Sequence, residues 1–144
     1  MAGTITSTVK SRKGLGIVRI RAAILVDASG VATATVIGSA FGRIVGIAYD
    51  PTAGAGGTMD TGADLTLTDG DSGATIWSLA NAGTSPLFKR PTMAVTDNAG
   101  AAITPATTAN DINRDIFVAG NIKLAVAQGG NVMTGALDVF VQEG

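Results

Sequence analysis

Short stretches rich in Val, Ile, Thr and Ala run the length of this chain, separated by Gly, Asp, Asn and Ser. The first group of residues is typical of strands and the second of turns. No segment of ten or more residues has a convincing helical period of 3.6, because Gly and Thr interrupt the Ala-rich stretches. The sequence therefore predicts an all-β fold with little helix.

The chain of 144 residues suits one domain with about eight to ten short strands. We expect strands at Thr4–Val9, Gly16–Asp27, Val31–Ser39, Gly42–Asp50, Ala63–Asp69, Ala74–Leu79, Thr92–Thr96, Ala101–Thr104, Ile116–Ala127 and Val132–Gln142. Turns at 70–73 and at 128–131 predict hairpins, the second around Gly129-Gly130. Pro51–Gly62 and Thr107–Arg114 are expected to be loops, the first of them mobile. Many short strands with frequent turns indicate a single-domain antiparallel β-sandwich or a jelly-roll-like barrel.

Alternation within these strands predicts which side chains share a face. The expected sets are Val31, Thr33, Thr35 and Ile37; Val45, Ile47 and Tyr49; Leu65 and Leu67; and Leu137, Val139 and Val141. Gly16–Asp27 is expected to be partly buried on both faces.

Charge is unevenly placed at the start of the chain, where Lys10, Arg12 and Lys13 precede the first long apolar strand. We expect residues 1–15 to form an extended basic arm and residues 16–144 to form the sandwich. The plain interpretation of this arm is a solvated tail, and the alternative is that it pairs with the sheet edge of a neighbouring subunit. Lys89 and Arg90 form a second basic spot. The partner-binding candidates are therefore Lys10, Arg12, Lys13, Lys89 and Arg90.

The residue types present limit the chemistry. With no Cys and no His, the chain has neither disulfides nor an imidazole base, and we predict no enzyme, no catalytic residue and no cofactor. A net charge of −1 argues against nucleic acid as a partner. No apolar run is long enough to span a bilayer, and the N-terminus does not resemble a secretion signal.

Three motifs suggest chemistry but fit ordinary turns and strands better. The Gly-rich segment Ala53–Gly57 lacks the Lys and the following helix of a phosphate-binding loop. Asp60, Asp64, Asp69 and Asp71 could ligate calcium, but no Glu closes the loop and Asp is common in turns. A glycosidase pair of Asp64 and Asp138 is disfavoured by the scarcity of aromatic residues. We therefore predict no metal site, leaving open whether the acidic loop 60–71 binds calcium.

The order of several motifs resembles a broad group of small phage structural proteins encoded among head and tail genes. The motifs are Ile24–Thr35 with Asp27-Ala28-Ser29-Gly30, Gly42–Pro51, Ala63–Asp69 and the stretch Gly120–Val141. They are strand and turn motifs, so the resemblance transfers no catalytic residue.

The resemblance implies a virion component made in the host cytoplasm, most plausibly a capsid cement or decoration protein. Such a protein would bind across major capsid protein subunits and stabilise the head. The alternative is a head–tail connector, tail or baseplate protein, and an enzyme or sugar-binding module is a more distant third possibility. Low charge density, with 15% charged residues, also suits self-association as a homo-oligomer, either dimer or trimer.

Overall fold

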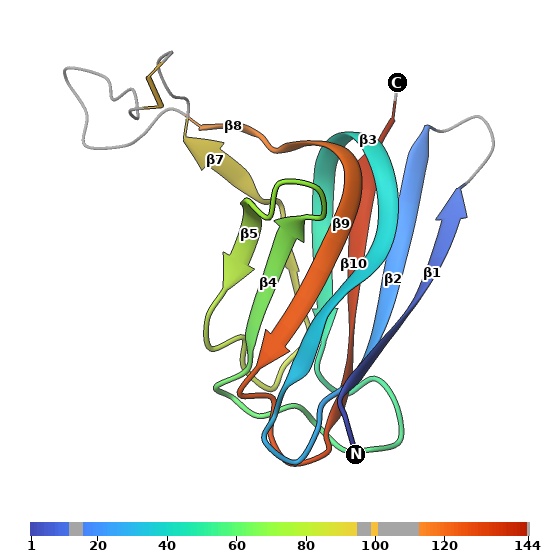
Figure 1. Cartoon of the computed structure of the whole chain (residues 1–144), viewed down its shortest axis with the longest axis vertical. Helices are drawn as coiled ribbons and strands as arrows, with labels where there is room; N and C mark the ends of the chain where they lie inside the picture. The colour runs from blue at the N-terminus through green and yellow to red at the C-terminus, as the bar shows by residue number, and fades with distance from the viewer. Residues whose placement is uncertain (12–15, 95–98, 101–112, 144) are drawn as a thin grey trace.

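The computed structural model describes residues 1–11, 16–94, 99–100 and 113–143, and these form an antiparallel all-β fold (Figure 1). The predicted fold class is confirmed. The strands are β1 (Thr4–Ser11), β2 (Ile17–Leu25), β3 (Ala32–Asp50), β4 (Asp64–Asp69), β5 (Thr75–Leu79), β6 (Leu87–Lys89), β7 (Thr92–Ala94), β8 (Asn113–Asp115), β9 (Phe117–Ala127) and β10 (Thr134–Gln142). None of the described residues forms a helix long and apolar enough to cross a membrane.

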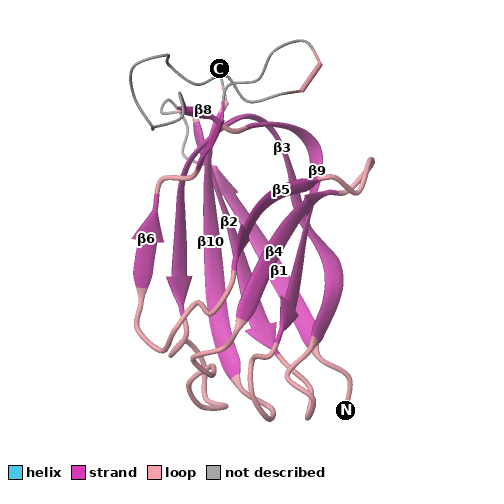
Figure 2. Ribbon diagram, turned by 90° about the vertical axis from the view of Figure 1, so that its left-hand side faces the viewer, coloured by secondary structure: helices cyan, strands magenta, loops and turns pink. Residues whose placement is uncertain are grey.

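The strand order β1-β2-β10-β3-β9-β4-β5 is arranged as two packed layers. The long strand β3 belongs to both layers, because it curves over one end of the molecule (Figure 1). Its first half pairs with β9, and its second half pairs with β10 and β6. One layer is therefore β1-β2-β10-β3-β6, with β6 at its edge (Figure 2). The other layer consists of the first half of β3 with β9, β4 and β5, while β7 and β8 form a separate two-stranded sheet.

The core lies between the layers and is built by alternation. Leu65 and Leu67 of β4 are fully buried, as are Leu137, Val139 and Val141 of β10, so the predicted faces of these strands are confirmed. From β2 and β9 come Ile20, Ala22, Ile24, Ile122, Leu124 and Val126. Each large aliphatic side chain contributes roughly 1.5–3 kcal/mol on burial, so this apolar layer supplies the main stabilising free energy. The hairpin of β4 and β5 across residues 70–73 is also confirmed.

The predicted hairpin around Gly129-Gly130 is wrong. β9 pairs with β3 and β4, whereas β10 pairs with β2 and β3, so the two strands lie in different layers. Residues 128–133 connect the layers and pack on the turn that follows β2: Gly129 N donates to Gly30 O at 2.8 Å and Val132 N donates to Asp27 O at 3.1 Å. A Gly-rich turn between two alternating strands is compatible with a hairpin and with a connection between layers, because alternation does not show which strands are neighbours in the sheet.

The predicted strands Val31–Ser39 and Gly42–Asp50 are one continuous strand with β-bulges. β3 has an extra residue opposite β9 after Ala32 and another after Val36, and each shift moves the following side chains to the other face. Consequently Ala32 and Ile37 are both buried while Val31 is exposed, so the predicted face shared by Val31 and Ile37 is wrong.

A third bulge in β3, opposite Phe140 and Val141, displaces Val45 from the predicted face. Ile44 is fully buried in its place, together with Ile47 and Tyr49. The bulges explain why the sequence pattern appeared to break between two strands at this point.

Of the predicted N-terminal arm, Thr4–Ser11 is the sheet strand β1, and residues 12–15 lie outside the described residues. β1 pairs with β2 at eight positions, from Thr4 opposite Leu25 to Ser11 opposite Val18, and so belongs to the sandwich.

The predicted loop after Pro51 is present, but Met59 within it is fully buried and its N–H donates to Pro51 O at 2.9 Å. Of the strand predicted at Thr92–Thr96, β7 covers the first three residues; the one at Ala101–Thr104 lies outside the described residues.

Candidate interaction face

The side chains that alternate with the core on the layer β1-β2-β10-β3-β6 form what we call the outer face. Strand register places two rows of residues straight across it. One row, from β1 to β6, is Thr8, Arg21, Asp138, Ala48 and Phe88, and the row beside it is Lys10, Arg19, Phe140 and Gly46. The outer face therefore combines cations, one carboxylate and aromatic rings near its centre.

Asp138 on the central strand β10 holds both arginines of β2. Arg21 Nη1 donates to Asp138 Oδ2 at 2.9 Å, and Arg19 Nε lies 3.4 Å from Asp138 Oδ1 as an ion pair without hydrogen-bond geometry. Residues two apart on a strand point to the same face, so one carboxylate on the neighbouring strand reaches both guanidinium groups. The Asp138 side chain is only 15% exposed, which fixes the arginines more firmly than a fully solvated pair would.

Phe88 and Phe140 form an aromatic contact beside this ion triad. Their ring centroids are 6.3 Å apart with planes tilted by 50°, a favourable geometry for aromatic pairs. The ring of Phe88 covers Gly46, where a Cβ atom would lie only 2.4 Å from Phe88 Cζ. Glycine at position 46 therefore permits the ring to lie over the sheet, yet Phe88 remains 64% exposed.

Two hollows flank the ion triad on the same face. One, of about 370 Å³, is lined by residues that include Asp50, Pro86, Phe88 and Asp138. The other, of about 270 Å³, lies between β1 and the loop after β3, and Thr4, Arg21, Ala53 and Thr134 are among its lining residues. The two volumes lie near the lower end of the range for ligand pockets, about 300–1,000 Å³. Each hollow can receive a protruding side chain of a partner.

Two acid–base groups at the first hollow, Tyr49 and Asp50, have shifted pKa values. Burial, followed by the charge of Asp50, raises the pKa of Tyr49 to about 12. Hydrogen bonds from the Thr52 hydroxyl at 2.7 Å and the Thr52 N–H at 2.9 Å lower the pKa of Asp50. Both shifts move the group away from the range that general acid–base catalysis uses.

Of the predicted partner-binding residues, the three that the structure describes, Lys10, Lys89 and Arg90, do not lie together. Lys10 lies on the outer face opposite Arg19, at one edge of the layer. Lys89 and Arg90 are at the opposite edge, since β6 is separated from β1 by three strands. Arg12 and Lys13 lie outside the described residues.

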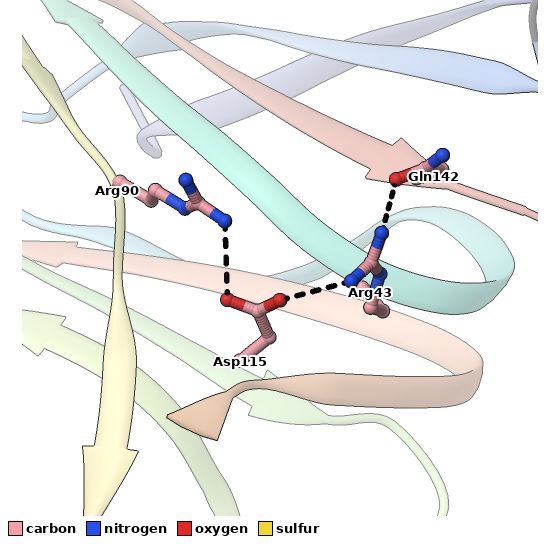
Figure 3. Close-up of polar contacts among 4 residues, drawn as sticks. All are labelled: Arg43, Arg90, Asp115 and Gln142. Atoms are coloured by element: carbon pink, nitrogen blue, oxygen red, sulfur yellow. Dashed lines mark hydrogen bonds and ion pairs between the residues drawn. The ribbon is translucent and has the colours of Figure 1, made fainter. Parts of the chain in front are cut away.

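Arg90 is already engaged within the chain. Its Nη2 lies 3.6 Å from Asp115 Oδ1, while Arg43 Nη1 donates to Asp115 Oδ2 at 3.2 Å (Figure 3). Arg43 Nη2 also donates to Gln142 Oε1 at 2.6 Å. Asp115 thus ties the segment after β6 to β3 and β10, which gives Arg90 a structural partner inside the chain.

The residues at the centre of the outer face were missed by sequence reasoning. A signal existed for the arginines, because Arg19 and Arg21 interrupt an otherwise apolar strand at alternate positions. Asp138 and Phe140 alternate with Leu137, Val139 and Val141 in the last strand, so they lie on the face opposite to the one predicted for those three residues. Their meeting with Phe88 depends on strand order, which no local pattern contains.

The acidic residues of the segment 60–71 are used in turns and loop contacts. Asp69 accepts from the Ser72 N–H at 2.8 Å and from the Ser72 hydroxyl, and these bonds lower its pKa. Asp64, at the other end of β4, accepts from Asn81 N and Gln128 Nε2, each at 2.9 Å. No group of three or more acidic side chains close enough to hold a metal occurs in the part of the chain that the structure describes. Asp64 and Asp138, the glycosidase pair weighed above, lie on strands separated by two others.

No match to a protein-family model, a curated protein or a solved structure was found for this chain. The resemblance of its motifs to phage structural proteins therefore remains a prediction from the sequence, and the outer face is assigned from its geometry alone.

Proposed function

We propose that this chain is a non-enzymatic structural protein of a phage particle, a capsid cement or decoration protein that binds across major capsid protein subunits through its outer face. Phe88, held largely exposed over Gly46 beside Phe140, is the observation that carries the adhesive role. Exposed aromatic rings next to arginines are the composition typical of the centres of protein interfaces. The assignment to a phage particle rests on the sequence motifs.

The ion triad supports the same interpretation. Arg19 and Arg21 are both about two-fifths exposed while their guanidinium groups are fixed by Asp138. Arginines that are already ordered lose less side-chain entropy when a partner binds. A contact of modest strength at each copy is multiplied when many copies cover a symmetric shell.

The test compares particles assembled with the wild-type chain, with a Phe88→Ala variant and with a Phe41→Ala variant. Phe41 is the matched control, because it is equally exposed at 64% but lies on the half of β3 that pairs with β9. We expect Phe88→Ala to reduce attachment to shells at least tenfold and to lower their rupture temperature to that of undecorated shells. Phe41→Ala should leave both quantities unchanged.

Attachment that is equal for the two variants would refute the outer face as the adhesive surface. Absence of the wild-type protein from purified particles would refute the function itself. Incorporation as a single ring of copies, instead of copies across the shell, would identify a connector or tail protein.

A further inference from the structure

β1 is an edge strand without the usual protection against pairing. It runs for eight residues opposite β2 with no register shift, contains no Pro, and carries one charge, Lys10, near its end. Just before β1, the backbone at Gly3 packs closely against the backbone of Val31. From Thr4 onward, and among the described residues, the only ladder partner of β1 is β2, so its other edge makes no ladder hydrogen bonds. Natural sheets normally block such edges with Pro, bulges, several charges or very short strands.

The sequence of β1 is complementary to itself when read antiparallel about Ser7. A twofold axis at Ser7, perpendicular to the sheet, places Ile5 opposite Val9 and Thr6 opposite Thr8 of a second copy. Ile5 and Val9 both face the interior side, since their partners in β2 are the buried Ile24 and Ile20. Val9 is nevertheless 52% exposed, and Ile5 of the second copy would cover it. The threonine pairs lie on the outer face, where cross-strand Thr–Thr contacts are favourable.

Neighbouring registers are worse on the same criteria. Shifting the axis by one residue in either direction pairs Ile5 with Ser7 or with Ser11 and loses the apolar contact. A twofold axis perpendicular to the sheet requires that directly opposite residues point to the same face. Registers with the axis between two residues would pair an inward-facing with an outward-facing residue, so they are excluded. In the Ser7 register the two Lys10 residues are separated by six residues along the strands, or about 20 Å. This distance exceeds the Debye length of about 8 Å, so the repulsion between the two charges is largely screened.

We propose that two copies of this chain pair through β1, antiparallel about Ser7, and join their outer faces into one continuous sheet. The occupant is a second copy because the apolar, threonine and charged positions all match under the same symmetry operation. The inference stands apart from the proposed function, since it concerns the purified protein without any particle.

The chain contains no cysteine, so a single introduced thiol is unique. Residues directly opposite in an antiparallel pair have Cα atoms about 4.5–5.5 Å apart, within the range that a disulfide spans. Under mild oxidation we expect Ser7→Cys to form a covalent dimer in high yield. Val9→Cys is the matched control, because its thiol would be at least as exposed. In the Ser7 register the two Cys side chains at position 9 are separated by four residues along the strands, or about 13 Å, so this variant should not form a disulfide with itself.

A mixture of Ile5→Cys and Val9→Cys should give a mixed covalent dimer, while neither variant links alone. Light scattering of the wild-type protein should give twice the chain mass, and Thr6→Pro, with circular dichroism confirming its folded state, should give the chain mass. A monomeric wild-type protein would overturn the proposal. So would Ser7→Cys linking no faster than Val9→Cys.

Discussion

Tyr49 offers a sharp test of the buried geometry, because it is the only tyrosine in the chain. Its side chain is 1% exposed, and its hydroxyl finds no hydrogen-bond partner among the described residues. Burial raises its pKa from 10.0 to about 12. Each pKa unit corresponds to about 1.4 kcal/mol, so the two-unit difference is linked to about 2.7 kcal/mol of unfolding free energy.

The sign follows from proton binding. Between pH 10 and pH 12 the folded state holds the phenolic proton that the unfolded state has lost. The free energy of unfolding therefore falls as pH rises through this window, and the contribution is fully present below pH 10. Tyr49→Phe removes the titrating group. Between pH 10 and pH 12 the variant should therefore lose about 2.7 kcal/mol less unfolding free energy than the wild type.

Two measurements check this prediction. Ultraviolet absorbance of the phenolate, followed during a pH titration of the folded protein, should give a midpoint near 12. Chemical denaturation of the wild type and Tyr49→Phe at several pH values should show curves that diverge above pH 10, with lysine titration common to both. Near neutral pH the variant should be more stable by up to about 1 kcal/mol, because an unpaired buried hydroxyl is lost. A phenolate midpoint near 10 in the folded protein, or parallel stability curves, would refute the reasoning.

Four other variants test the remaining contacts. Gly46→Ala should displace Phe88 and lower the free energy of unfolding by about 1–3 kcal/mol, seen by denaturation together with loss of the aromatic ring contact in NMR spectra. Met59→Ala, at a fully buried position, should lower it by about 2–5 kcal/mol, and a loss below about 1 kcal/mol would contradict its place in the core. Asp138→Ala leaves two arginines unpaired and should lower stability by about 1 kcal/mol, less at high salt; no salt dependence would argue against the ion triad. Asp69→Asn should flatten the acid limb of the stability curve, because a lowered carboxyl pKa gives stability that is lost as pH falls below about 4, and an unchanged acid limb would exclude its bonds to Ser72.

The sequence contained enough information to predict the fold class and some shared faces, but not how the strands connect. Alternation in Ala63–Asp69 and Val132–Gln142 correctly predicted which side chains share a face, because that pattern arises when one face of a strand is buried. Gly129-Gly130 correctly indicated a turn. Whether that turn makes a hairpin or crosses between layers depends on contacts with the distant Asp27 and Gly30, which local chemistry does not specify.

The alternation of apolar and polar residues could not reveal the bulges of β3, for a different reason. Each bulge reverses the relation between position and face, so a strict period of two gives the wrong answer after Ala32 and again near Val45. The exposed Val31 and the buried Ile37 are the result. The two strands predicted at Val31–Ser39 and Gly42–Asp50 are one strand, β3, which passes from one layer to the other.

The same bent strand determines why the outer face could not be inferred from charge alone. Because β3 crosses from one layer to the other, its second half brings Gly46 beside Phe140 of β10 and leaves its free edge to β6. β6 in turn places Phe88 over Gly46, where the missing Cβ leaves room for a ring. Had β9 and β10 formed a hairpin, β3 would not separate them and Phe140 would lack this aromatic neighbour. The outer face is therefore a product of strand order, and of the basic residues predicted from the sequence, Lys10 and Lys89 lie on the two edge strands of its layer.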